Sequence, residues 1–188
     1  MSLEKPLHYG KSLIKDVLHY GDLAVDATAG NGHDTVFLAK AVGPGGRVWA
    51  FDIQAQALEQ VRLRLEKESL LHHHVTLLQV GHEKMAVHVP AGVGAIMFNL
   101  GYLPGGDHNI ITRPETTLTA VNAGLGLLRR GGIMTLIVYP GHQGGREEGL
   151  LLEEFLLQLP QENYQVLKYC FLNQRNQPPY LLAVYKLS

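Results

Sequence analysis

The sequence has little cysteine, little net charge and no long hydrophobic run, and each shortage excludes a class of protein. Cys170 is the single cysteine among 188 residues, so an intramolecular disulfide is excluded and a reducing cytoplasm is expected. The net charge of −1 creates no global basic field, so a nucleic-acid partner needs a local patch. No stretch approaches the roughly 20 apolar residues of a membrane span. The first residues contain no apolar signal core.

What the chain does contain is an ordinary globular composition, with 46% apolar residues. Its length suits one domain, which we place over residues 1–188. Apolar runs alternate with stretches of helical periodicity five times, and two further runs close the chain. Strands are expected at 23–27, 47–51, 75–80, 93–98, 133–139, 164–172 and 179–187. Helices are expected at 10–20, 34–41, 55–70, 82–87, 113–130 and 147–159, with Thr112 and Glu115 forming a capping box before the fifth. This order predicts an α/β fold: a doubly wound, mostly parallel seven-stranded sheet with an antiparallel C-terminal hairpin strand.

The stretch 23–35 reads LAVDATAGNGHDT and has the pattern of a buried strand, a glycine-rich turn and a helix. Gly30 and Gly32 would let a ligand approach the backbone, because glycine has no Cβ. The helix that follows offers free N–H groups and a positive dipole end. The pattern therefore predicts a cofactor with an adenosine part. Asp26, at the strand end, is either part of that site or a turn-capping residue.

The choice of cofactor depends on what surrounds these glycines. A dinucleotide fingerprint requires a third glycine where this chain has Thr35, and a Walker-type Gly-Lys-Ser/Thr ending is absent. Asp52, at the end of the second strand, can accept hydrogen bonds from both ribose hydroxyls, and Gln54 is close to it. A ligand with a ribose but no pyrophosphate fits best, and S-adenosylmethionine (SAM) is such a ligand.

Six motifs carry a resemblance that covers nearly the whole chain. They are DATAGNGHDT at 26–35, FDIQ at 51–54, GHEKM at 81–85, NLGYLPGGDH at 99–108, RPETT at 113–117 and YPGHQGGREE at 139–148. The sequence resembles the family labelled "putative rRNA methylase", whose studied members methylate the aminomethyl group of 5-aminomethyl-2-thiouridine at the tRNA wobble position. The resemblance implies a class I methyltransferase fold, which is Rossmann-like, with SAM as methyl donor and tRNA as partner.

The resemblance also implies which residues line the cofactor. Carried over by motif, these are Asn31, His33, Asp52, Gln54 and His82. With their neighbours in the same motifs, the predicted cofactor-binding residues are Asp26, Gly30, Asn31, Gly32, His33, Asp34, Asp52, Gln54, Gly81, His82 and Asn99.

The chemistry is expected at residues 99–107, after the fourth strand. Asn99-Leu100-Gly101-Tyr102 is similar to the Asn/Asp-Pro-Pro-Tyr loop of amino-group methyltransferases. There the Asn oxygen and the next carbonyl accept amine N–H bonds and aim the nitrogen lone pair at the methyl group. We predict Asn99 and Tyr102 as catalytic-loop residues and Asp107 as proton acceptor. Asn99 as a turn residue and Tyr102 as a packed loop aromatic are the alternatives.

Two loops are expected to face the substrate. Residues 104–108 would form a flap, and residues 139–148 the opposite wall. An anticodon loop requires basic side chains and stacking platforms. The candidates, each of which also has an ordinary structural explanation, are Tyr102, His108, Arg113, Tyr139, His142, Arg146, Lys168 and Arg175. Arg129 and Arg130 are instead expected to pair with the dipole at a helix C-terminus.

Other interpretations of the histidines, of Cys170 and of the function compete with this hypothesis. We expect no metal, because the adjacent histidines 72–74 cannot all face one ion on a strand and the pair His82 and His142 has no evident carboxylate or cysteine partner. Cys170 is expected in the core. Another RNA site, a small-molecule amine, a non-catalytic adenosyl-binding regulator and a nucleotide-dependent oxidoreductase remain alternative functions, and the oligomeric state, a homodimer included, stays open.

Overall fold

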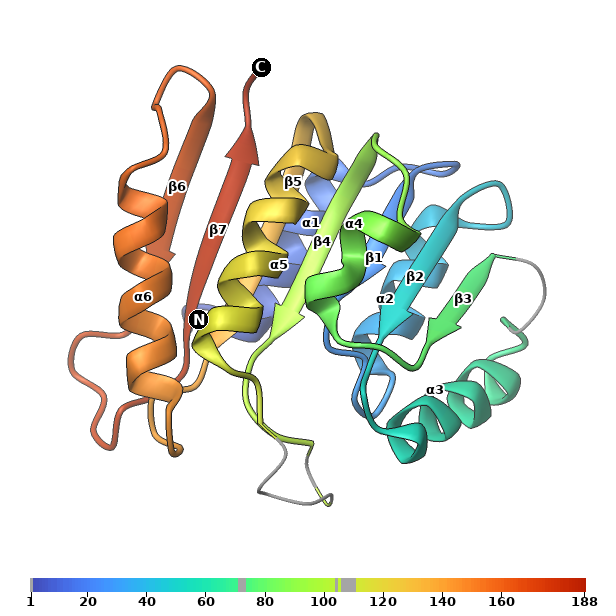
Figure 1. The fold of residues 1–188 in the computed structure, drawn as a ribbon, viewed down its shortest axis with the longest axis horizontal. Coiled ribbons are helices and arrows are strands. Elements are labelled where there is room, and N and C mark those ends of the chain that lie inside the picture. Colours follow the sequence, from blue (N-terminus) through green and yellow to red (C-terminus); the bar gives the residue numbers. More distant parts are fainter. Residues whose placement is uncertain (1, 71–73, 104, 106–110) are drawn as a thin grey trace.

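A computed structural model of the chain describes residues 2–70, 74–103, 105 and 111–188. Its elements alternate as the sequence predicts (Figure 1). In chain order they are α1 (Pro6–Val17), β1 (Leu23–Asp26), α2 (His33–Val42), β2 (Arg47–Phe51), α3 (Ala55–Lys67), β3 (Val75–Leu78), the 3₁₀ turn η1 (His82–Lys84), α4 (Met85–His88), β4 (Val93–Asn99), α5 (Pro114–Leu127), β5 (Leu128–Val138), α6 (Gly145–Leu157), β6 (Tyr164–Tyr169) and β7 (Tyr180–Lys186).

The seven strands form one sheet in the order β3-β2-β1-β4-β5-β7-β6. Each neighbouring pair from β3 to β5 is parallel, and β7 runs antiparallel to both β5 and β6. The prediction of a doubly wound, mostly parallel sheet with an antiparallel C-terminal strand is therefore confirmed. The strand order reverses at β1 and β4, and the carboxyl ends of the parallel strands lie together at the lower edge in Figure 1. That is where ligands bind in such folds.

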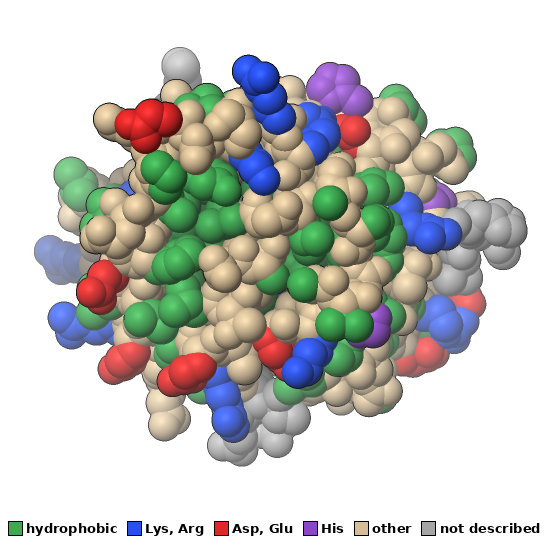
Figure 2. Space-filling model, turned by 45° about the horizontal axis from the view of Figure 1, so that its top comes forward, with side chains coloured by type: hydrophobic (Ala, Val, Ile, Leu, Met, Phe, Trp, Pro, Cys, Tyr) green, Lys and Arg blue, Asp and Glu red, His purple; other side chains and the backbone are tan. Residues whose placement is uncertain are grey.

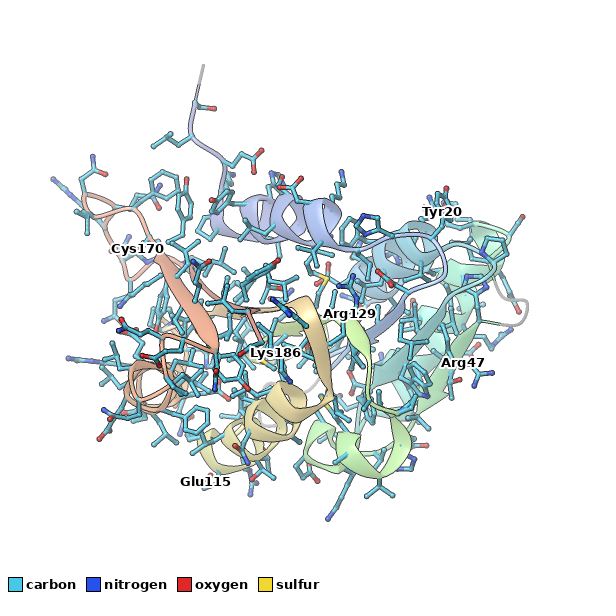
Figure 3. The ribbon with its side chains drawn as sticks, turned by 90° about the horizontal axis from the view of Figure 1, so that it is seen from above. Tyr20, Arg47, Glu115, Arg129, Cys170 and Lys186 are labelled. Atoms are coloured by element: carbon cyan, nitrogen blue, oxygen red, sulfur yellow. The ribbon has the colours of Figure 1, made fainter. Side chains whose placement is uncertain are left out.

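Helices cover both faces of the sheet, which explains why the central strands are mostly apolar (Figures 1 and 3). On one face α1, α2 and α3 contribute Ile14, Leu38 and Val61 to a core cluster. On the other face α4, α5 and α6 contribute Met85, Val121 and Leu152 to a second cluster. The sheet is thus fixed from both sides, and its carboxyl edge is a rigid support for the loops that follow it.

The boundary between α5 and β5 differs from the expected one. The helix ends at Leu127 and the strand begins at Leu128, so the prediction of a helix through Arg130 is wrong. Pairing of Leu128 with Val93 on β4 draws this segment into the sheet. Arg129 donates to the carbonyl of Val17, the last residue of α1, at 3.0 Å and to Asp22 at 2.9 Å, so it pairs with the C-terminus of α1 rather than with that of α5 (Figure 3).

Two smaller expectations are also wrong. Arg113 is the N-cap residue of α5 and no side chain caps that end, because the Thr112 hydroxyl donates to Glu148 at 2.9 Å. Cys170 is exposed rather than in the core, since it follows β6 at the sheet edge (Figure 3).

The surface agrees with the balanced composition. Basic and acidic side chains are interspersed on the face shown in Figure 2. Within the described residues, no helix combines the length and apolar character that crossing a membrane requires.

Candidate active site

A cavity of about 800 Å³ opens at the carboxyl edge of the sheet. It is lined by the loops that follow β1, β2, β4 and β5 and by the segment before η1. Residues far apart in the sequence therefore meet in one space, as expected for parallel strands. The predicted site residues on its wall are Gly30, Asn31, His33, Asp34, Asp52, Gln54, Gly81, His82, Asn99, Tyr102, Arg113, Tyr139 and His142.

The glycine loop is held beside Asp52. The Gly30 N–H donates to one oxygen of Asp52 at 3.0 Å, and the Gln54 N–H donates to the other at 2.9 Å. Each carboxylate oxygen keeps a second lone pair, and Asp52 lines the cavity. The carboxylate is thus oriented by the backbone and retains the capacity to accept ribose hydroxyls.

Gly32 supports this loop from behind and is not among the residues that line the cavity. Its φ is +80°, and a Cβ there would stand 2.9 Å from the Cα of Val61 on α3. Arg64, also on α3, donates to the carbonyl of Asn31 at 2.8 Å. Glycine at 32 therefore allows α3 to approach and fix the loop.

Asp26 also lies behind the cavity wall. It is 1% exposed and accepts hydrogen bonds from the Thr35 hydroxyl at 2.6 Å and the Thr28 N–H at 3.2 Å. Burial, reinforced by the charge of Asp34, raises the pKa of Asp26 to about 7. Asp34 reaches the cavity and forms an ion pair with Lys11 at 2.7 Å. Asp26 thus shapes the loop from the interior.

His33 and His82 line the cavity near the glycine loop. His82 is 7% exposed, and burial lowers its pKa, so the neutral ring is favoured. Its Nδ1 lies 3.1 Å from the carbonyl oxygen of Ala27, which requires that Nδ1 carry the hydrogen. Partial burial together with the charges of Arg64 and Lys11 lowers the pKa of His33.

Asn99 ends β4 and is fixed from both neighbouring strands. Its N–H donates to the hydroxyl of Thr28, in the loop after β1, at 2.7 Å. Its side chain forms a hydrogen bond with Tyr139, which follows β5, and burial raises the pKa of that phenol. The next residue, Leu100, donates its N–H to the Ile137 carbonyl at 2.9 Å. Asn99 therefore stands on the wall of the cavity that Asp52 also lines, in a restrained position.

The loop after Asn99 is closed at its neck. Gly101 and Thr112 bond in both directions: the Gly101 N–H donates to the Thr112 hydroxyl, and the Thr112 N–H donates to the Gly101 carbonyl, each at 2.9 Å. Tyr102 pairs with Ile111, is 40% exposed, and meets the ring of His142 edge-on with centroids 6.1 Å apart. Tyr102 thus presents an aromatic surface at the cavity.

Other predicted residues are not brought to the cavity. Asp107 and His108 lie outside the described residues, as does most of the predicted flap. Arg146 and Arg175 are exposed and are not among the residues that line the cavity. Lys168 is bonded to both carboxylate oxygens of Glu153, at 2.8 and 2.7 Å. Of the cations predicted to contact substrate, Arg113 is on the cavity wall.

Some residues of the site are not predicted by any motif in the sequence. Thr28 fixes Asn99, Leu103 closes against Gly30, and Gln177 reaches the cavity from the turn before β7 with a φ of +49°. The sequence pattern gives little indication of their roles, because each is a common residue type in a loop. No group of three or more His, Cys, Asp or Glu suited to a metal occurs in the part of the chain that the structure describes.

Comparison with known proteins decides the family. The family described as "Putative rRNA methylase" matches residues 48–185. The chain belongs to this family. The match contains Asp52, His82, Asn99 and the loop after β5, so five of the six motifs that carried the resemblance lie in the matched region, and the glycine-loop motif at 26–35 precedes it.

Solved structures agree along the whole chain. A protein described as a "putative rRNA-methylase" from Clostridium thermocellum is 43% identical with a TM-score of 0.97, and each chain is covered completely. A protein described as a "putative methyltransferase" from Streptococcus mutans, solved in complex with S-adenosylhomocysteine (SAH), is 37% identical with a TM-score of 0.90, covering 99% of this chain and 100% of that one. The predictions of a class I methyltransferase fold and of a methyltransferase are confirmed.

A curated relative adds a named reaction. It is the chloroplastic tRNA (mnm(5)s(2)U34)-methyltransferase of Arabidopsis thaliana, which is 41% identical over an alignment of 181 residues, and the alignment covers 92% of this chain. The match spans 66% of the length of that relative.

Proposed function

We propose that this protein, one methyltransferase domain over residues 1–188, transfers a methyl group from SAM to the aminomethyl group of 5-aminomethyl-2-thiouridine at the tRNA wobble position. The observation that carries the proposal is the position of Asn99. It stands on the wall of the same cavity as Asp52 and the glycine loop, restrained by Thr28 and Tyr139. The relative in Arabidopsis thaliana supports this choice of acceptor.

The cofactor is SAM, which the family membership and the SAH-bound relative support. The residues present fit it: Asp52 keeps lone pairs for ribose hydroxyls, and the backbone at Gly30, with a φ of +48°, has no Cβ facing the cavity. When bound, SAM supplies a methyl group on a sulfonium, which is a good leaving group. The protein must therefore supply position and a shaped, dry pocket more than acid or base strength.

Asn99 would orient the acceptor amine. The side-chain oxygen of Asn99 and the adjacent backbone carbonyl would accept hydrogen bonds from the two N–H groups of the amine. The lone pair of the amine nitrogen would then point away from both acceptors, toward the side where SAM would bind. This requires a neutral amine, because an ammonium group has no lone pair. Tyr102 would stack on the base or stabilise the cation that forms on nitrogen.

A proton must leave the nitrogen during the reaction. Asp107 remains the proposed acceptor for that proton, directly or through water. Asn99 cannot take this role, because a neutral amide is not a base at physiological pH.

An RNA partner would meet a small basic surface. Arg113 on the cavity wall, with the exposed Arg146 and Arg175, would contact phosphates, and Tyr139 and Tyr102 would flank the extruded base. Because the net charge is −1, we expect modest affinity for RNA that falls steeply with salt. A cytoplasmic location and a homodimer remain predictions.

Calorimetry with SAM, SAH and NAD tests the cofactor class. We expect SAM and SAH to bind with one site per chain and NAD to give no heat of binding. Binding of NAD alone would reject the proposal in favour of an oxidoreductase. Binding of SAM without transfer to any tRNA or amine would favour a non-catalytic regulator.

A second experiment separates the acceptors. Labelled SAM is offered with intact tRNA that carries the aminomethyl nucleoside, with the nucleosides of the same tRNA after digestion, and with ribosomal RNA. The proposal predicts transfer to intact tRNA alone. Equal transfer to the free nucleoside would indicate a small-molecule amine methyltransferase, and transfer to ribosomal RNA another RNA site.

A further inference from the structure

Glu148 is a buried carboxyl group that connects two walls of the cavity without lining it. It lies in the first turn of α6 and is 1% exposed. Its Oε2 accepts a hydrogen bond from the Thr112 hydroxyl at 2.9 Å, and its Oε1 lies 2.6 Å from the Thr117 hydroxyl. Burying a carboxyl group is costly unless its partners satisfy it, and the methyl transfer described above does not use Glu148.

One branch of this network leads to the loop that follows Asn99. The Thr112 hydroxyl that donates to Glu148 also accepts the Gly101 N–H at 2.9 Å. Because a hydroxyl has one hydrogen, its donation to Glu148 leaves its lone pairs directed at Gly101. Glu148 therefore fixes the rotation of this hydroxyl and, with it, the neck of the catalytic loop.

The other branch leads to the cofactor wall. The Thr117 hydroxyl lies 3.5 Å from Nε2 of His82, whose Nδ1 contacts the Ala27 carbonyl at 3.1 Å. A carbonyl only accepts, so Nδ1 carries the hydrogen, and Nε2 of the neutral ring is an acceptor. For the neutral ring, the hydrogen in this contact must therefore come from Thr117.

Two arrangements of hydrogens satisfy these contacts, and one of them places a proton on Glu148. If Glu148 is ionised, the Thr117 hydrogen points to it, and Nε2 of His82 must carry a second hydrogen that it donates to Thr117, so both groups are charged. If Oε1 carries a proton, it donates to Thr117, whose own hydrogen then turns to His82. Each hydrogen bond in the network then contains one hydrogen, from Gly101 through Thr112, Glu148, Thr117 and His82 to Ala27. An ion pair would leave two charges on side chains that are only 1% and 7% exposed. Burial accordingly raises the pKa of Glu148 and lowers that of His82, so the neutral pair is favoured.

We propose that Glu148 is a protonated positioning residue, which sets the catalytic loop through Thr112 and the ring of His82 through Thr117. The functional meaning of the two branches rests on the proposed methyl transfer. Other titratable groups lie near Glu148: His142, in the loop after β5, lowers the pKa of Glu148, and Tyr180 lies on β7, where burial and then Glu153 raise the pKa of the phenol. The pH dependence of SAH affinity therefore reflects all of these groups, and the variants Glu148→Gln and Glu148→Ala separate the contribution of Glu148.

The two branches predict different losses. Thr117→Val removes the donor to His82, so SAH affinity should fall about two- to tenfold, the equivalent of one hydrogen bond. Thr112→Val loosens the catalytic loop, so the rate of methyl transfer at saturating SAM should fall by about tenfold, whereas SAH affinity should stay within about twofold. Serine keeps the hydroxyl, so Thr117→Ser should retain the SAH affinity and Thr112→Ser should retain the rate of methyl transfer. Thr119→Val is the matched control, because Thr119 is on the same helix, exposed, and bonded to the Glu115 carbonyl.

Glu148→Gln and Glu148→Ala test the proton itself. A glutamine amide donates to Thr117 and accepts from Thr112, as the protonated carboxyl does, so Gln should recover the SAH affinity and turnover that Ala loses. Gln should also flatten any loss of SAH affinity at high pH that reflects ionisation of Glu148. Nitrogen-15 spectra of the wild-type histidines supply a readout that needs no variant: His82 should be neutral with its hydrogen on Nδ1.

The proposal is overturned if Gln behaves like Ala, if His82 is protonated on both nitrogens, or if His82 carries its hydrogen on Nε2 alone. If Glu148→Ala does not fold, the comparison of Glu148→Gln with wild type and the nitrogen-15 spectra still test whether Glu148 is protonated. SAH calorimetry and the spectra require no acceptor. If wild type binds SAH and shows the expected His82 signal but methylates no tRNA, the proposed function fails while the role of Glu148 stands.

Discussion

Replacing Gly32 by alanine is expected to separate the support of the cofactor loop from its contacts with ligand. Gly32 has a φ of +80°, which costs an alanine about 1–2 kcal/mol. The new Cβ would stand 2.9 Å from the Cα of Val61 and 3.3 Å from its Cγ2, well inside the usual contact of about 3.5–4.0 Å. Relieving such overpacking costs about 1–3 kcal/mol. Because the closest atom is backbone, trimming Val61 would not relieve the contact.

The assay for Gly32→Ala is urea unfolding together with SAH calorimetry. The two costs predict a loss of unfolding free energy of about 2–5 kcal/mol, and displacement of the loop from Asp52 should weaken SAH by about tenfold or more, the equivalent of about 1.4 kcal/mol. Gly21→Ala is the matched control, since Gly21 has a φ of +91° and the described residues leave open space around it. Equal destabilisation by the two variants would refute the claimed contact with Val61.

The remaining predictions concern the two walls of the cavity and the residue behind them. Asn99→Ala should lower single-turnover transfer about 100-fold and leave SAH affinity within about threefold; loss of SAH binding in calorimetry would instead place Asn99 in the cofactor site. Asp52→Ala should weaken SAH about 10- to 100-fold, because it removes charge-assisted acceptors of the ribose; unchanged affinity by calorimetry would contradict that contact. For Asp26, burial raises the folded-state pKa from 3.8 to about 7, so the resulting stabilisation is complete below about pH 3.8 and is lost as the pH rises through about 7. The unfolding free energy of wild type relative to Asp26→Asn, measured by urea titration, should therefore fall across that window, and a flat difference would contradict the raised pKa.

The residues at strand ends were predictable from the sequence for a geometric reason. In a parallel sheet the carboxyl ends share one edge, so Asp52, His82, Asn99 and Tyr139 had to meet once their strands were recognised. The structure brings all of them to one cavity. Their individual roles remain predictions, because proximity does not show what each one binds.

Other features depended on contacts that no local pattern encodes. Leu128 and Arg129 continue the helical spacing of α5, but pairing with β4 places them in β5. Glu148 looks like an ordinary acid in the first turn of a helix, and its partners Thr112 and Thr117 lie 36 and 31 residues away. Thr112 has the spacing of a helix cap, yet its hydroxyl is used by this buried network.

The mass of the wobble nucleoside tests the central claim most directly. Transfer RNA bearing 5-aminomethyl-2-thiouridine is incubated with the protein and SAM, digested to nucleosides and analysed by mass spectrometry, with Asn99→Ala as the matched control. The account predicts that this nucleoside gains the mass of one methyl group with the wild-type protein and that the gain is strongly reduced with the variant. An unchanged nucleoside under conditions where the wild-type protein binds SAH would contradict it.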